Sequence, residues 1–394
     1  MSEKCINGKK ISIRNRIINY LIILFMIHGF LYFLRPQEIY DLNSPIRYIK
    51  YLVLILTLII ILRESSFKKI FIYILVSTTL LVLNIIAVEQ NFSFMSIVSY
   101  ILPLSIFFFH EGLRKNLNIK TIVYWTYIVA TFFGYFEFFI MGGVFYRFAS
   151  SGYRVISIFV NPNNFALMLT LLSIVIISDR ISKTKVFVLL INSLLLILLS
   201  GSKTGLFIFI LVVSLRWIID LLHLFVAKSK LKKNVLLYIP IIGISLICFT
   251  LIITLSNKFN LNVLLNQIRS IETMMISLES RFMQYSNFLS VSNLIFPWKE
   301  NVNYTDNIYF HLWGTFGFPV VISYVFFNMY LLYKTIIKRS FTYFAIMFIF
   351  LISGFSTNII YLWPLGYIYW YVAGSILSNK TNMRIYVEQR CLYD

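Results

Sequence analysis

Charged residues are scarce in this sequence. Only 13% of the 394 residues are Asp, Glu, Lys or Arg, whereas a typical soluble domain has about 25%. Hydrophobic residues make up 59% of the chain, and the mean hydropathy is +0.82. A soluble globule cannot bury that much apolar surface, so the composition excludes a soluble enzyme and a disordered chain.

Cysteines and metal-binding motifs are also scarce. Cys5 and Cys391 are terminal and Cys248 lies in an apolar run, so none is placed to form a disulfide framework. The sequence has no Asp-x-Asp, His-Glu-x-x-His or Cys-x-x-Cys motif. The histidines lie on different segments: His28, His110, His223 and His311. We therefore expect neither a metal ion nor a cofactor.

The net charge of +20 comes from 35 Lys and Arg residues against 15 Asp and Glu residues. In a soluble protein such an excess would indicate nucleic-acid binding. Here the basic residues form short clusters between apolar runs, which is typical of the signals that orient membrane helices. The pattern predicts membrane lipids as partners, and no nucleic acid.

Long apolar runs predict an all-α, polytopic membrane protein with about twelve transmembrane helices in a single domain, residues 1–394. If the N-terminus is inside, most Lys and Arg residues fall in inner segments, so both termini are predicted to be cytoplasmic. The predicted spans are about 17–34, 48–62, 70–88, 92–109, 119–141, 158–178, 186–200, 205–227, 235–256, 307–333, 341–358 and 361–377.

One long outer segment, residues 257–306, separates the ninth and tenth predicted spans. Apolar residues recur on one helical face in its first half, which predicts an amphipathic helix. Its second half has the composition of an irregular loop. The helix could brace the outer leaflet or cover a site that opens toward lipid, and the sequence leaves both interpretations open.

Basic residues of the predicted outer face form a candidate anion site. Arg147 and Arg154 lie in one outer loop, Lys203 in a tight loop, and Arg269 and Arg281 in the long one. Guanidinium groups suit phosphate because they offer a planar fork of donors. Taken singly, each of these residues could instead contact lipid headgroups or pair with an acid.

The segment Asn161-Pro162-Asn163 begins an apolar run at the same predicted face. Asn is a favourable helix N-cap and Pro a favourable first helical residue. A helix that begins there would direct free N–H groups and the positive end of its dipole outward. The segment is either a well-capped helix start or, with Arg154 and Lys203, part of a diphosphate cradle.

Two acids are candidates for catalysis. Glu137 is the one acid well inside an apolar run, where a carboxylate is costly and is usually paired or functional. It could form a structural pair with an outer arginine. Asp306 precedes the tenth predicted span, where it could cap a helix or act as a base at the mouth of a site.

The outer-loop arginines and the Asn161-Pro162-Asn163 segment are followed along the chain by two further motifs. These are Ser200-Gly201-Ser202-Lys203-Thr204-Gly205 and Asp306-Asn307-Ile308-Tyr309. The pattern resembles the superfamily of bacterial O-antigen ligases and Wzy-type O-antigen or capsular repeat-unit polymerases. It covers about residues 145–335 in motif and the whole chain in topology. Ligases commonly have histidine where this chain has Asp306, so the resemblance is closer to the polymerases.

The resemblance implies a metal-independent glycosyltransferase of GT-C architecture in the bacterial inner membrane, with its active site facing the periplasm or cell exterior. Such polymerases join undecaprenyl-diphosphate-linked repeat units into the O-antigen of lipopolysaccharide or into capsule. The family's diphosphate-binding residues would correspond to Arg154 and Lys203, and then to Arg147 and Arg281. A chain-length regulator and a flippase are the expected protein partners.

Two other functions stay open. An O-antigen ligase would transfer glycan to lipid A-core rather than to another repeat unit. A lipid-linked oligosaccharide flippase would show repeated halves and charges along a central path. This chain instead concentrates its unusual charges on the predicted outer face and has one large asymmetric loop.

Overall fold

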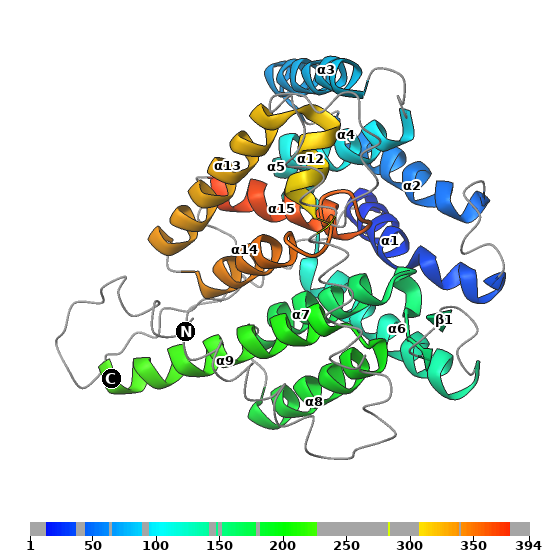
Figure 1. Cartoon of the computed structure of the whole chain (residues 1–394), viewed down its shortest axis with the longest axis vertical. Helices are drawn as coiled ribbons and strands as arrows, with labels where there is room; N and C mark the ends of the chain where they lie inside the picture. Colours follow the sequence, from blue (N-terminus) through cyan, green and yellow to red (C-terminus); the bar gives the residue numbers. More distant parts are fainter. Residues whose placement is uncertain are drawn as a thin grey trace, which may run out of the picture.

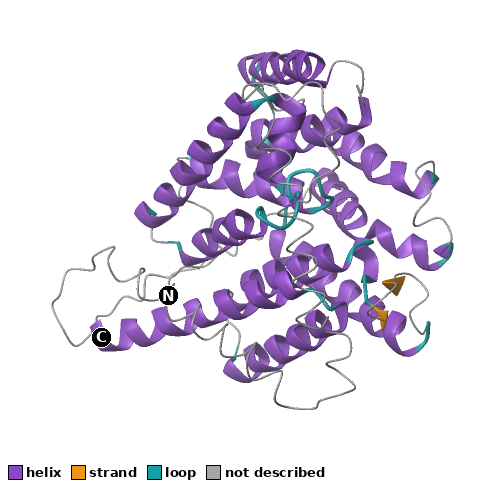
Figure 2. Cartoon of the chain, viewed as in Figure 1, coloured by secondary structure: helices purple, strands orange, loops and turns teal. Residues whose placement is uncertain are grey.

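The computed structural model describes residues 13–36, 44–62, 65–88, 94–141, 147–148, 152–178, 182–226, 283, 307–338 and 340–378. These residues are helical almost throughout (Figures 1 and 2). Within them, two short strands, β1 (Arg147–Phe148) and β2 (Gly152–Tyr153), pair antiparallel between α6 and α7. The architecture is therefore a packed set of helices.

Apart from α9 and α12, between which only Met283 is described, consecutive helices are separated by short connections. In chain order they are α1 (Ile13–Ile27), η1 (His28–Phe33), α2 (Pro45–Leu62), α3 (Phe67–Val88), α4 (Phe94–Phe108), α5 (His110–Asn116), α6 (Ile119–Phe139), η3 (Ser157–Phe159), α7 (Pro162–Ile177), α8 (Lys183–Ser200), α9 (Lys203–Val226), α12 (Ile308–Phe316), α13 (Phe318–Ile337), α14 (Phe341–Ser353) and α15 (Leu365–Leu377).

Four of these segments are long and apolar enough to cross a membrane: Asn15–Phe33, Phe67–Ala87, Ile119–Phe139 and Phe318–Ile337. Shorter apolar helices fill most of the other predicted spans. The prediction of an all-helical chain with membrane-crossing helices is confirmed to this extent. The predicted span 235–256 and, apart from Met283, the long loop 257–306 lie outside the described residues.

The predicted span 307–333 is wrong as a single helix. The chain breaks at Gly317, where φ is 89° and ψ is 165°, a conformation that favours glycine. Pro319 then occupies the first turn of α13, where its missing N–H costs nothing. Hydropathy alone joins α12 and α13 because both are apolar. The membrane-length helix is α13, and α12 is a separate short one.

Helix α7 lies at the centre of the lower half of the molecule in Figure 1, and its side chains are buried on nearly every face. It packs against α6, α8, α9 and α14, and also against η3. In contrast, α3 lies at the edge of the bundle and has most of its side chains at least partly exposed (Figure 1). A helix that is apolar and buried all round belongs to the core of the bundle.

Helices α7 and α9 approach very closely at their first turns. A Cβ atom added to Gly205 would lie 2.3 Å from the Cβ of Ala166, so only glycine fits there. We expect Gly205→Ala to lower the free energy of unfolding by about 1–3 kcal/mol, as overpacked cores do. Thermal unfolding in detergent measures the effect. Adding Ala166→Gly should restore part of the loss, and an additive double variant would contradict this contact.

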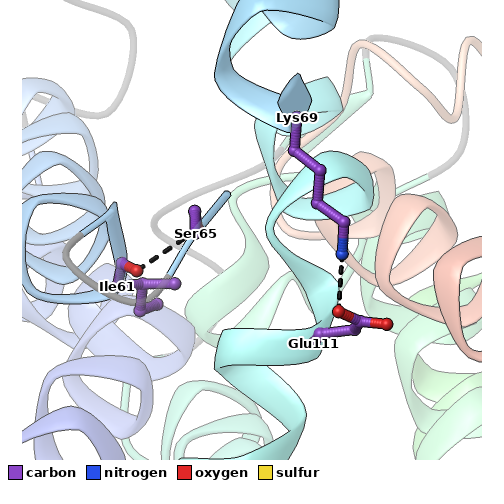
Figure 3. Close-up of polar contacts among 4 residues, drawn as sticks. All are labelled: Ile61, Ser65, Lys69 and Glu111. Carbon is purple, nitrogen blue, oxygen red and sulfur yellow. Dashed lines mark hydrogen bonds and ion pairs between the residues drawn. The ribbon is translucent and has the colours of Figure 1, made fainter. Parts of the chain in front are cut away.

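At the end of the bundle opposite to Gly205, exposed polar contacts join α3 to α5. Lys69 at the start of α3 lies 2.6 Å from the Glu111 carboxylate of α5 (Figure 3). Nearby, the Ser65 hydroxyl donates to the Ile61 carbonyl at 3.3 Å, where α2 ends. Both charged side chains are exposed, and exposed ion pairs contribute only about 0–1 kcal/mol. This end has the features of an ordinary helix connection.

Candidate functional site

The side chain of Arg154, in the segment between β2 and η3, joins the ends of two helices. Its Nε donates to the Ser200 carbonyl at the end of α8, at 2.8 Å. Its Nη2 donates to the Asn163 side-chain oxygen in the first turn of α7, at 3.2 Å. The side chain is only 7% exposed. A buried guanidinium fixed in this way presents a constant positive charge to whatever lies beside it.

The start of α7 confirms the predicted cap. Asn161 is the N-cap, and its side-chain oxygen accepts from the backbone N–H of Asn163 at 2.8 Å and of Asn164 at 3.4 Å. Pro162 is the first helical residue. Because the Phe165 N–H also donates to the Asn161 carbonyl at 2.9 Å, Asn161 takes up the N–H groups that the sequence led us to expect free, and the helix dipole leaves this end of α7 with a partial positive charge.

A second helix start lies beside the first. Gly201 ends α8 with a φ of 59°, which allows the chain to reverse sharply into α9. The Ser202 hydroxyl then accepts from the Gly205 N–H at 3.1 Å, as a helix N-cap does. Lys203 is the first residue of α9 rather than part of a loop. Because Gly205 packs on Ala166, the N-termini of α7 and α9 are neighbours.

Glu137 lies fully buried near the end of α6. Its Oε2 accepts two backbone hydrogen bonds, from the N–H of Ile156 at 3.0 Å and of Ser157 at 2.7 Å. The Ser157 hydroxyl donates in turn to the Ala130 carbonyl at 2.7 Å. The carboxylate therefore fastens the segment that follows Arg154 to helix α6.

The same segment has an unusual backbone. Ser157 and Val160 have positive φ values of 50° and 61°, although neither is glycine. Such residues cost about 1–3 kcal/mol each and persist where the surroundings impose them. Here Glu137 accepts a hydrogen bond from the Ser157 N–H. On the Ile158 side, Gly29 of η1 packs so closely on the Ile158 carbonyl that a Cβ atom added to Gly29 would collide with it. The backbone beside Arg154 is thus held in a single arrangement.

The structure brings together Arg154, Asn161, Asn163 and the helix start at Lys203, and Glu137 binds the backbone two and three residues after Arg154. The structure does not describe the side chains of three other predicted site residues. Arg147 is in β1, and its side chain is not described. Arg281 and Asp306 lie outside the described residues.

Asn307, rather than Asp306, is the N-cap of α12. Its side-chain oxygen accepts from the backbone N–H of Tyr309 at 2.8 Å and of Phe310 at 3.3 Å. The capping role that the sequence offered for Asp306 is therefore filled by its neighbour. The role of Asp306 as a base stays a prediction.

Sequence reasoning missed two contacts that fix Arg154 and the segment after it. One is the hydrogen bond from Arg154 to the Ser200 carbonyl, and the other is the pair of hydrogen bonds from the Ile156 and Ser157 N–H groups to Glu137. The run Ser200-Gly201-Ser202 was the available signal, because a glycine between two serines predicts a helix end followed by a cap. No local pattern indicates which distant side chain binds a loop's N–H groups.

Within the described part of the chain, no group of three or more His, Cys, Asp or Glu residues is placed to hold a metal ion. Comparison with protein-family models, with curated proteins and with solved structures finds no match for this chain. The site is a buried arginine that joins the end of α8 to the start of α7, with the start of α9 next to α7, an arrangement that suits a phosphate or diphosphate group.

Proposed function

We propose that this protein is a polymerase that joins undecaprenyl-diphosphate-linked oligosaccharide repeat units into O-antigen or capsular polysaccharide at the outer face of the bacterial inner membrane. The proposal includes about twelve spans and a GT-C architecture. The observation that carries it is the site around Arg154, where one guanidinium and two helix starts meet within an apolar helical bundle.

The reaction balances without an added cofactor. A hydroxyl of the acceptor sugar attacks the anomeric carbon of the donor sugar, and the new glycosidic bond forms as the bond to the diphosphate oxygen breaks. The hydroxyl proton passes to a carboxylate, for which Asp306 is the proposed base. The lipid diphosphate leaves with an added negative charge, and fixed positive groups stabilise that charge.

Each residue of the site has a part in this scheme. Arg154 and Lys203 bind the diphosphate, and the N-terminus of α7, capped by Asn161 and joined to Arg154 through Asn163, adds the positive end of its dipole. Arg147 and Arg281 are proposed as further basic groups of the same face. Glu137 was the alternative base, but its engagement with two backbone N–H groups supports a positioning role instead.

The test uses substrate made by the cell itself. A strain that lacks this gene should accumulate single lipid-linked repeat units, and the purified protein in proteoliposomes should convert them to a ladder of longer chains. Products that appear only after lipid A-core is added would favour the ligase. Transfer of the units across the vesicle bilayer without polymerisation would favour the flippase.

The direction of insertion can be tested separately, because the charge pattern predicts it. In a variant that lacks Cys5, Cys248 and Cys391, single cysteines placed in 257–306 should react with a membrane-impermeant thiol reagent in cells with a permeabilised outer membrane. Cysteines placed in 228–234 should react only after lysis. Labelling of 228–234 in intact cells would overturn the orientation, and with it an outward-facing site.

A further inference from the structure

The connection between α14 and α15, residues 354–364, lies at the same end of the bundle as Arg154. The backbone N–H of Ile308 donates to the Gly354 carbonyl at 3.0 Å, and the Asn307 side chain donates to the Phe355 carbonyl at 3.2 Å. These contacts join the connection to the start of α12. Asp306, the proposed base, is the residue immediately before Asn307 in the chain.

The other side of this connection faces the segment that follows Arg154. The Trp363 ring lies 6.1 Å from the ring of Phe159 in η3, and 4.2 Å from the ring of His28, measured between centroids. The connection thus lies between the diphosphate site and the start of α12. Phe159 follows Arg154 by five residues, so the connection packs against the segment that carries the arginine.

Three buried polar atoms of this connection have no hydrogen-bond partner among the described residues. They are the Thr357 hydroxyl, the Asn358 side-chain oxygen and the Trp363 indole N–H. The three side chains are only 5%, 5% and 8% exposed. Leaving such a group unpaired costs about 1–3 kcal/mol, so three in one short connection indicate that something else completes them.

Aromatic rings surround the same connection. The Asn358 side-chain N–H donates to the Tyr100 hydroxyl at 3.3 Å, and the Tyr100 ring stacks on His311 at 5.8 Å. The Tyr361 ring lies 5.7 Å from both of them. Flat rings beside a few precisely placed polar groups are typical of small-molecule sites, and such rings suit the C–H faces of a sugar.

We propose that the connection 354–364 binds a sugar ring of the lipid-linked repeat unit, with its hydroxyls completing Thr357, Asn358 and Trp363. The proposal rests on the function proposed above and names the subsite for the sugar. A phosphate fits these groups poorly, because the Asn358 oxygen is an acceptor and would repel it. Sugar hydroxyls fit because each can both donate and accept.

Thr357→Val tests the proposal, since it removes the hydroxyl and nearly keeps the shape. In the protein without substrate, losing an unpaired buried hydroxyl should keep or raise the melting temperature. With lipid-linked repeat units extracted from cells that lack the gene, the KM in proteoliposomes should rise about fivefold, the effect of one lost neutral hydrogen bond. Trp363→Phe, which keeps a ring and removes the N–H, should act in the same direction.

Thr126→Val is the matched control. The Thr126 hydroxyl on α6 is also fully buried without a partner among the described residues, but it lines an apolar cavity of about 150 Å³ that is also bounded by α1, α7 and α15. Its removal should keep or raise the melting temperature and leave KM unchanged.

The outcomes separate the two proposals. An unchanged KM for both Thr357→Val and Trp363→Phe would overturn the sugar subsite, and the three polar atoms would then be completed by water alone. A lower melting temperature for Thr357→Val without substrate would also overturn it, because the hydroxyl would then already be paired. Failure of the unaltered protein to lengthen the repeat units would instead overturn the proposed function.

Discussion

Arg154→Ala should abolish the polymer while the protein remains folded in the membrane. The guanidinium is buried between Ser200 and Asn163, and no other described side chain is shown to take its place. Removing one preorganised group that stabilises developing charge typically costs about 10²–10³-fold in kcat. The measurement is the ladder of chain lengths in cells, together with turnover in proteoliposomes.

Arg154→Lys should restore only a small part of this activity, because an ammonium group is a point charge and lacks the planar fork of donors that matches a phosphate. Arg216→Ala is the control. Arg216 lies in α9 with its guanidinium 5.3 Å from the centre of the Phe341 ring, away from the helix starts. It should leave the ladder unchanged. A normal ladder from Arg154→Ala at normal protein level would remove Arg154 from the site.

The second large effect concerns Glu137. Glu137→Ala should lose both polymer and folded protein, because it leaves the N–H groups of Ile156 and Ser157 buried without their acceptor, at about 1–3 kcal/mol each. Glu137→Gln keeps an oxygen that can accept both bonds. It should therefore retain polymer formation within about tenfold, as expected for a net loss of about 1.4 kcal/mol.

The glutamine variant decides between two roles. If the Glu137 carboxylate takes a proton during the reaction, Glu137→Gln should be as inactive as Glu137→Ala, because an amide is not a base, and its protein level should be normal. Loss of polymer at normal protein level would contradict the positioning role. Membrane protein level and the activity of purified material should be measured together for both variants.

Local rules accounted for much of the fold. The length of the apolar runs predicts most of the described helices, and Asn161-Pro162 fixes where α7 begins. The break at Gly317 was missed because a hydropathy window averages across it. Yet Gly317-Phe318-Pro319 contains both signals that end one helix and start another.

The arrangement of the site could not be predicted from the sequence, because it is made by contacts between distant residues that no local pattern specifies. Arg154 and Lys203 were chosen from charge and position, and the structure places Arg154 among the helix starts. The segment from Arg154 to Val160 adopts its backbone because Glu137 and Gly29 impose it from other helices. The connection 354–364 drew no attention in the sequence, because its polar residues matter only through where they are buried.

The central position of α7 has a consequence for the assembly of the protein during synthesis. Helix α7 is made midway through the chain, but one of its walls is α14, which emerges much later. The two are also joined at the far end, where the Thr342 hydroxyl donates to the Ser178 hydroxyl at 2.8 Å. Until α14 inserts, that face of α7 must rest against lipid or the insertion machinery. A nascent chain stopped before residue 341 would therefore have the arginine and both helix starts, but an unfinished support behind them.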